Sequence, residues 1–345
     1  MDPETCQETG TKVVTFIWYR LLQGVWIIVA ILAMVGISSV YFLHIKSSKL
    51  HVNIQILLML FLFSAFLINV VVVITQTYQL TISFTYVEPC DVFLSPSFYI
   101  IFNIAHGFFT ELYLLTMATM MFERTLATVY VSSYEQMAHS AGLMGATTAI
   151  LFATLIEFLL YYGATINDLQ ISTTNSASGI ANRIDYVLIF NISSSALTMM
   201  TMIILLLVNT KRSELAIGII SHRFQTEENI ETTKFIARIA FAQLIAFSVQ
   251  SLGGLLLRTY GEYIYNENDV RIRKLSKLLL QVMPLFTLII SIIIAMTIRS
   301  TATRRRSRLK TQMCISNDID YTTKYLQNQW SRAGPKTNAN LPDIT

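Results

Sequence analysis

The chain has 345 residues, of which 53% are apolar and only 13% are charged, and its mean hydropathy is +0.53. Soluble domains carry about 25% charged residues, so two water-surrounded domains, which the length alone would suggest, are excluded. Intrinsic disorder of the bulk is excluded as well, because it requires low hydrophobicity and high net charge, whereas the net charge is +4. Three cysteines are too few for a disulfide-based fold.

Long apolar segments recur along the whole chain. A helix needs about 20 apolar residues to cross a bilayer, and seven segments meet this condition: 22–43, 52–75, 98–122, 140–163, 186–208, 235–257 and 277–298. Ionisable side chains well inside them are few, and include Glu111, Glu157 and Arg238. In lipid, a helix forms all the hydrogen bonds of its backbone N–H and C=O groups within itself. We therefore predict an all-α membrane protein, a bundle of seven transmembrane helices.

Positive charge is divided unequally between the two sides that seven spans define. On one side, the N-terminus and three loops together contain eight Lys and Arg residues. On the other side, seventeen lie in segments 43–51, 123–139 and 209–234, at Arg238 and in the C-terminal tail. The positive-inside rule therefore places the C-terminus in the cytoplasm and the N-terminus outside. One loop does not fit, because the segment from Arg258 to Lys277 carries five positive charges on the predicted outer side.

These spans predict three parts: an extracellular N-terminus (1–21), the seven-transmembrane bundle (22–298) and a basic, flexible cytoplasmic tail (299–345). Directly after the seventh span, the tail carries Arg304, Arg305 and Arg306. Each such charge contributes about 1 kcal/mol near anionic lipid of the inner leaflet, so we expect lipid contact there. A nucleic-acid partner is not expected, because the cluster is tethered to a bilayer.

No enzyme motif occurs in the sequence. A Walker loop, a paired-histidine motif, a nucleophile elbow and metal-spaced cysteine pairs are all absent. We therefore expect no catalysis, no cofactor and no metal.

The third span ends in Glu123-Arg124-Thr125-Leu126-Ala127-Thr128. An acid followed by an arginine at this place resembles G-protein-coupled receptors, in which the arginine pairs with acids at rest and contacts a partner protein when released. The alternative is a solvated membrane boundary. Before the sixth span lie acids such as Glu228, which either pair with Arg124 or stabilise a helix N-terminus.

This motif, together with Tyr134-Glu135 and with His222-Arg223-Phe224-Gln225 and Glu228-Asn229, resembles the nematode serpentine chemoreceptors of the alpha, alpha-beta, beta and epsilon classes. Tyr134-Glu135 is most similar to class epsilon. The resemblance implies a plasma-membrane chemoreceptor, in sensory neurons and their cilia, that binds a small-molecule or peptide cue and signals to a heterotrimeric G protein. Its coupling residues would be Glu123, Arg124, Arg223 and Glu228.

A seven-span transporter or ligand-gated channel is the alternative function. Transporters often show repeated halves, and no such repeat is visible here. Insect-type chemosensory channels also have seven spans but the opposite orientation, so the side on which the C-terminus lies separates the two hypotheses.

Ionisable groups inside a bilayer are costly and usually point into the bundle. His106, Glu111 and Tyr113 in the third span and Glu157 in the fourth are therefore candidates for a ligand cavity. The alternative for Glu111 is a hydrogen bond between helices. A separation of five residues turns His106 and Glu111 about 140° apart, so the two need not face one cavity.

Two cysteines, Cys6 and Cys90, fall on the predicted outer side, and the loop between the fourth and fifth spans has none. A Cys6–Cys90 bridge is therefore the available external pairing, and two free thiols are the alternative. The sequence Asn191-Ile192-Ser193 has the pattern of a glycosylation site, but it lies within the predicted fifth span. We expect it to carry no glycan.

Overall fold

The computed structural model describes residues 6–45, 51–130, 140–164, 170–173, 177–215, 220–265, 270–300 and 303. The chain divides into two compact units, Met1–Ala295 and Met296–Thr345, and the contacts described below lie within the first unit. All regular secondary structure in the described ranges is helical.

Seven stretches are long and apolar enough to span a membrane, in the predicted order: Ile17–Leu43, Val52–Thr85, Pro89–Val129, Ser140–Tyr161, Ala181–Glu214, Asn229–Thr259 and Val270–Ser300. Their main helices are α3 (Ile17–Val40), α4 (Val52–Thr85), α5 (Pro96–Val129), α6 (Ser140–Tyr161), α7 (Ala181–Leu215), α8 (Ile220–Thr259), α10 (Val270–Leu279) and a helix over 283–300. The predicted all-α bundle with seven membrane-length helices is confirmed.

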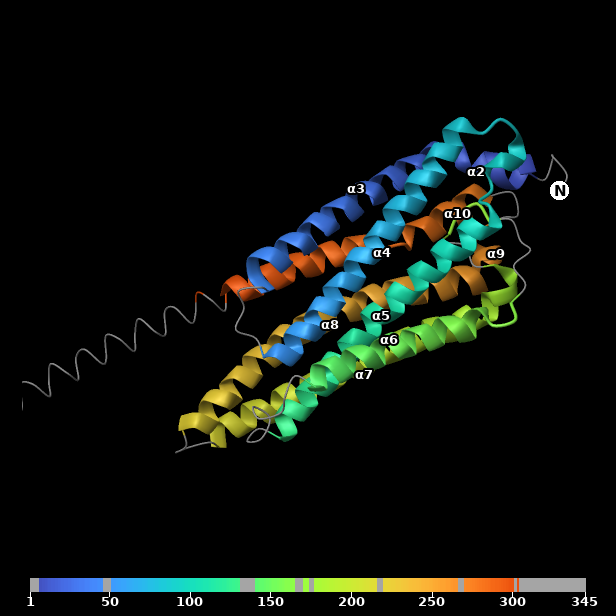
Figure 1. Cartoon of the computed structure of the whole chain (residues 1–345). Coiled ribbons are helices and arrows are strands. Elements are labelled where there is room, and N and C mark those ends of the chain that lie inside the picture. The colour runs from blue at the N-terminus through green and yellow to red at the C-terminus, as the bar shows by residue number, and fades with distance from the viewer. Residues whose placement is uncertain are drawn as a thin grey trace, which may run out of the picture. The chain divides into compact units, whose positions relative to one another are not determined.

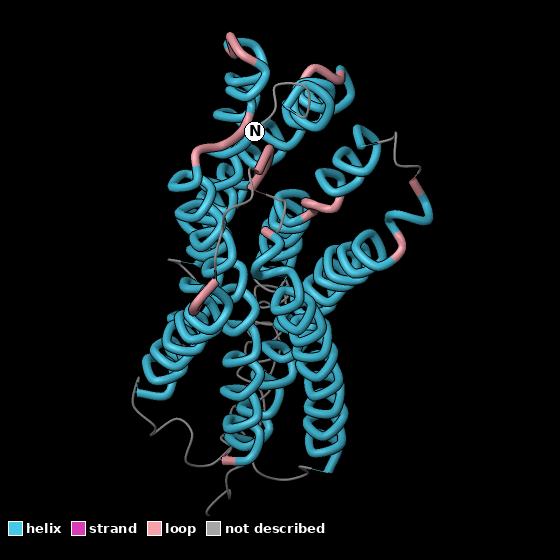
Figure 2. Tube along the Cα trace, turned by 90° about the vertical axis from the view of Figure 1, so that its right-hand side faces the viewer, coloured by secondary structure: helices cyan, strands magenta, loops and turns pink. Residues whose placement is uncertain are grey.

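Short elements connect these helices. They are η1 (Gln7–Thr11), α2 (Lys12–Val14), η2 (Tyr41–Ile45), η3 (Pro89–Val92), η5 (Ser178–Ile180) and α9 (Gly261–Ile264). Figures 1 and 2 show the long helices packed lengthwise beside one another, and Figure 1 shows α2, α9 and α10 toward one end. We call this the disulfide end, because it contains the Cys6–Cys90 bond, and the end with Arg124 the opposite end.

The last span is interrupted rather than continuous. Helix α10 ends at Leu279, and the helix over 283–300 begins just before Pro284. Proline is accepted in the first turn of a helix because the amides there have no partner within the helix. At the break, Nε2 of Gln76 donates to Oε1 of Gln281 at 2.9 Å, and Nε1 of Trp26 donates to the Leu278 carbonyl at 3.0 Å. Side chains of α3 and α4 therefore hold the interruption.

Helix α6 packs closely on α4 at Gly142. The Gly142 amide donates to Oδ1 of Asn53 at 3.2 Å, and a Cβ at this position would lie 2.7 Å from the Cα of Asn53. A backbone atom cannot rotate away, so a side chain here must separate the two helices.

We therefore expect Gly142→Ala to destabilise the bundle by about 1–3 kcal/mol, the usual range for overpacking. The measurement is the melting temperature of the detergent-solubilised protein. Gly145→Ala is the matched control, because a Cβ at Gly145 would meet the Leu57 side chain at an ordinary 3.5 Å. A Gly142→Ala variant that melts no lower than the Gly145→Ala variant would contradict this close packing.

Candidate functional site

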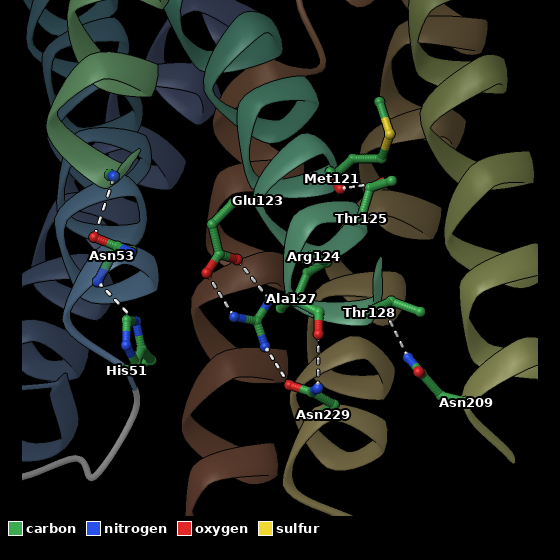
Figure 3. A network of polar contacts seen from close by, with 11 residues as sticks. His51, Asn53, Met121, Glu123, Arg124, Thr125, Ala127, Thr128, Asn209 and Asn229 are labelled. Atoms are coloured by element: carbon green, nitrogen blue, oxygen red, sulfur yellow. Dashed lines mark hydrogen bonds and ion pairs between the residues drawn. The ribbon is translucent and has the colours of Figure 1, made fainter. Parts of the chain in front are cut away.

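The end of α5 carries a buried ion pair. The side chains of Glu123 and Arg124 are each 3% exposed. Nε and Nη2 of Arg124 donate to the two carboxylate oxygens of Glu123, both at 2.6 Å (Figure 3). This two-point geometry is the strongest form of a charge-assisted hydrogen bond. The adjacent residue thus supplies a partner carboxylate for the arginine.

Asn229 of α8 joins this ion pair to a second helix. Its Oδ1 accepts a hydrogen bond from Nη1 of Arg124 at 3.5 Å, and its Nδ2 donates to the Ala127 carbonyl of α5 at 3.2 Å (Figure 3). One carboxamide therefore contacts both the guanidinium and the α5 backbone. Movement of α8 away from α5 would break both contacts together.

Helix α7 is attached at the same end through Thr128. Nδ2 of Asn209 donates to the Thr128 hydroxyl at 3.0 Å, and Nη1 of Arg212 donates to the Thr128 carbonyl. Helix ends leave their last carbonyls without helical partners, and Arg212 satisfies one of them. Polar bonds therefore join α5, α7 and α8 beside the Glu123–Arg124 pair.

Other predicted residues of this end fall outside the described part of the chain. The side chains of Arg223 and Glu228 are not described, and neither are residues Tyr134 and Glu135 or the basic cluster Arg304, Arg305 and Arg306. Their roles stay predictions. Asn229, Asn209 and Arg212 were missed as site residues, although Asn229 belongs to the Glu228-Asn229 motif that the resemblance used.

The middle of the bundle holds a second polar group around Glu111, which is 2% exposed. Its Oε1 accepts a hydrogen bond from Nδ2 of Asn191 in α7 at 2.8 Å. Its Oε2 has no hydrogen-bond partner among the described residues. Glu111 therefore makes the interhelical hydrogen bond that was one of its two predicted roles, while one oxygen is left without a bond.

Glu157 of α6 lies against α5 at Gly107. A Cβ at Gly107 would lie 2.4 Å from Oε1 of Glu157, so the glycine leaves the space that this carboxyl group occupies. The Glu157 and Glu111 carboxyl groups are near enough to interact electrostatically. Oε2 of Glu157, like that of Glu111, is buried without a hydrogen-bond partner in the described ranges. Two of the predicted ligand residues therefore lie in one region of the bundle.

The other two predicted ligand residues are placed differently. Nε2 of His106 is buried and has no hydrogen-bond partner among the described residues. Tyr113 is 1% exposed and stacks on Phe61, with ring centroids 4.2 Å apart. Two positions along a helix differ by about 200°, so Tyr113 points away from the side of α5 that carries Glu111. Tyr113 packs in the core, and its role in ligand binding stays a prediction.

A small cavity lies between α5, α7 and α8. It is too narrow to admit a water molecule, and it is lined by Leu114, Met117, Ser195, Thr198, Ala240 and Gln243. The Ser195 hydroxyl and both Nε2 and Oε1 of the Gln243 side chain are buried without hydrogen-bond partners in the described structure. Pockets for drug-sized ligands measure about 300–1,000 Å³, so these helices must separate before such a ligand fits between them.

The segment between α6 and α7 covers part of the disulfide end. The Leu94 amide donates to the Gln170 carbonyl at 2.9 Å, and Nδ2 of Asn103 donates to the Thr173 carbonyl at 2.7 Å. The Ala177 amide donates to the Tyr99 hydroxyl at 3.1 Å. Hydrogen bonds from α5 and from the segment before it therefore hold this loop, which has no cysteine.

The disulfide joins Cys6, just before η1, to Cys90 in η3, with the two Cα atoms 5.1 Å apart. Of the two alternatives that the sequence left open, the structure contains the bridge. It ties the N-terminal segment to the start of the third span. The adjacent Gly10 lies so near Val92 that a Cβ there would be 2.7 Å from its Cγ2.

Comparison with known proteins gives a consistent assignment. Residues 4–331 match the family described as serpentine type 7TM GPCR receptor class ab chemoreceptor. Serpentine receptor class beta-17 of Caenorhabditis elegans is 29% identical over 237 residues, which cover 67% of this chain and 65% of that relative. Class beta-16 of the same species is 23% identical over 337 residues, covering 95% of this chain and 97% of the relative. This chain thus spans slightly less than two thirds of the first relative and nearly all of the second.

A further relative, serpentine receptor class alpha-2 of Caenorhabditis elegans, is 31% identical over 108 residues, which cover 31% of this chain and 32% of that relative. The similarity is therefore to classes alpha and beta, and the predicted proximity to class epsilon is not confirmed. That prediction depended on Tyr134-Glu135, and two residues are too short a motif to separate related receptor classes.

Proposed function

Because the chain belongs to the serpentine class ab family of seven-transmembrane chemoreceptors, we propose that it binds a small-molecule or peptide cue and activates a heterotrimeric G protein. The observation that carries this proposal is the buried Glu123–Arg124 pair and its bond to Asn229. The pair sits where α5, α7 and α8 are joined by polar contacts. Such a junction can adopt a second packing, and a receptor needs two packings with different partners.

The same three helices meet again inside the bundle, and this suggests how a cue acts. Glu111 of α5 binds Asn191 of α7, and the small cavity lies between α5, α7 and α8. A cue that enters there meets the Ser195 hydroxyl and the Gln243 side-chain amide of the cavity and has to separate these helices. The unpartnered oxygens of Glu111 and of Glu157 in α6 are further acceptors nearby on α5 and α6. Separation of α8 from α5 would then release Arg124 from Asn229 at the opposite end.

We further propose that the disulfide end faces the outside of the cell and that the C-terminal tail is cytoplasmic. A disulfide persists in an oxidising compartment, and the charge distribution agrees with this orientation. The parts are then the extracellular N-terminus (1–21), the bundle (22–298) and the tail (299–345), whose Arg304–Arg306 cluster contacts anionic inner-leaflet lipid. The plasma membrane, and the sensory cilium in particular, is the proposed location.

Orientation is tested with epitope tags at the two ends of the chain. We expect an antibody to label an N-terminal tag on intact cells and a C-terminal tag only after permeabilisation. Each tagged protein serves as the control for the other, because permeabilised cells must show both. Labelling of the C-terminal tag on intact cells would place Arg124 outside, exclude G-protein coupling there and favour the transporter or channel alternative.

A further inference from the structure

Four cations gather at the disulfide end, where α8 ends and α10 begins. Arg258 lies in the last turn of α8, and Arg273, Lys274 and Lys277 follow one another within α10. Arg273 and Lys274 lie four and three residues before Lys277, so the three side chains share one face of α10. Helix α10 contacts α8, and Lys277 and Arg258 are near enough to repel each other. We call these four residues the cationic cluster. They belong to the loop whose five positive charges violate the positive-inside rule.

Most of this positive charge has no described counterion. Asp185 of α7 binds Arg258 at 2.8 Å. Arg273, Lys274 and Lys277 make no ion pair with a described carboxylate, and Nε of Arg273 is buried without a hydrogen-bond partner in the described part of the chain. The acids of the same loop lie outside the described side chains: Glu262, Glu267 and Asp269.

Three neighbouring cations that are only partly exposed repel one another and lose part of their hydration, and both effects are unfavourable without an anion. Guanidinium and ammonium groups bind carboxylate, sulfate and phosphate through charge-assisted hydrogen bonds. We propose that the cationic cluster binds the anionic group of the cue, which is therefore an organic anion. The assignment of the anion to a cue rests on the proposed receptor function.

The surroundings of the cluster support an organic anion rather than an inorganic one. Val270 lies one turn before Arg273 and Lys274 on the same face of α10, and it packs against a buried apolar cluster that includes Trp26 and Leu278. An apolar group attached to the anion would therefore meet an apolar surface one helical turn away. Nε1 of Trp26 donates to the Leu278 carbonyl, next to Lys277. The fluorescence of Trp26 therefore reports changes at this site once the other two tryptophans, Trp18 and Trp330, are replaced by phenylalanine.

The test is the binding of three probes, hexanoate, hexyl sulfate and hexyl phosphate, to the purified full-length receptor in phosphatidylcholine nanodiscs, read by tryptophan fluorescence. We expect saturable binding that is at least tenfold tighter than that of 1-hexanol. The Arg273→Gln/Lys277→Gln variant should weaken it at least tenfold, whereas Arg273→Lys/Lys277→Arg, which keeps both charges, should retain it. Both variants are first shown to be monodisperse.

Arg271→Gln is the matched control. Arg271 is an exposed cation of the same helix whose guanidinium lies over the Phe16 ring, 5.6 Å from its centroid, so its loss should leave probe binding unchanged. Equal binding of hexanol and the anions, no saturable binding, or an unaffected Arg273→Gln/Lys277→Gln variant would overturn the proposal. Binding is measured without a G protein, so failure here and failure of coupling are separate results.

Two further arms identify what occupies the cluster. A lipid headgroup shares the chemistry of the probes, and loss of probe binding when phosphatidylglycerol is added to the nanodiscs would assign the cluster to lipid and overturn its assignment to the cue.

The acids of the loop are tested with Glu267→Gln/Asp269→Asn. A tenfold rise in probe affinity would show that these acids already neutralise the cluster, which also overturns the proposal, whereas unchanged affinity supports it.

Discussion

Replacement of Glu123 by alanine is expected to raise G-protein activation in the absence of a cue at least tenfold. Both members of the Glu123–Arg124 pair are 3% exposed, and Arg124 donates two hydrogen bonds to Glu123. Removal of one partner of a buried ion pair costs about 3–5 kcal/mol, because the buried guanidinium loses this carboxylate. Arg124 recovers part of this free energy by moving to solvent, which breaks its contact with Asn229. A bias of this size is sufficient to change which of two packings predominates.

The measurement is nucleotide exchange on a panel of purified heterotrimeric G proteins, with the receptor in nanodiscs and no cue present. Glu214→Ala is the matched control, because Glu214 is an exposed acid on α7 whose loss should leave exchange unchanged. Glu123→Ala/Arg124→Ala should recover part of the thermal stability, since it removes the buried cation together with its carboxylate, but should not activate the G protein. Wild-type exchange and melting temperature in the Glu123→Ala variant would contradict the role of the pair.

The seven spans could be predicted from the sequence because each depends only on a local run of apolar residues. The lengths of the helices could not be predicted in this way. Helix α8 begins at Ile220, whereas the apolar run begins near residue 235. Hydropathy reports the part of a helix that contacts lipid, while the polar turns before Phe235 extend the same helix, and Asn229 among them bonds to α5.

In the candidate sites, too, residues that are neighbours in the sequence could be predicted, whereas partners from distant helices could not. Glu123 and Arg124 are adjacent and stand at the end of a recognisable span, so the sequence indicated both. Their neighbour Asn229 is 105 residues away from Arg124 in the chain, and Asn191 is 80 residues away from Glu111. Which asparagine reaches an ionisable group depends on the rotation and register of packed helices, and a single sequence contains no local signal for either.

Asn191 shows how a local motif can point to the wrong chemistry. Its sequon indicates glycosylation, but its side chain is 4% exposed and bonded to Glu111 within the bundle. Only the position inside a predicted span argued against a glycan. The cationic cluster is the converse case, because its departure from the positive-inside rule was visible in the sequence, while the half-buried arrangement on α8 and α10 required the structure.

Removal of the Cys6–Cys90 bridge is expected to lower the melting temperature and to weaken cue binding while leaving the Arg124 junction intact. The two cysteines are 84 residues apart, and the entropy of closing a flexible loop of this length is equivalent to about 4–5 kcal/mol. Two membrane-spanning helices, α3 and α4, lie within the loop and stay helical when the bundle unfolds. The effective loop is therefore shorter, and we expect a loss of about 2–3 kcal/mol.

Cys6→Ser and Cys90→Ser should have equal effects, and their combination should add nothing further, because either change removes the same bond. Melting is followed by size-exclusion chromatography after heating, with and without a reducing agent, and the reducing agent should lower the melting temperature only of proteins that keep the bridge. Cys314→Ser in the tail is the matched control and should behave as the wild type does.

The Glu123→Ala change, made in the bridge-free protein, should still raise nucleotide exchange, since the bridge and the ion pair lie at opposite ends of the bundle. Equal melting of the oxidised wild type and the Cys6→Ser protein would contradict a stabilising bridge.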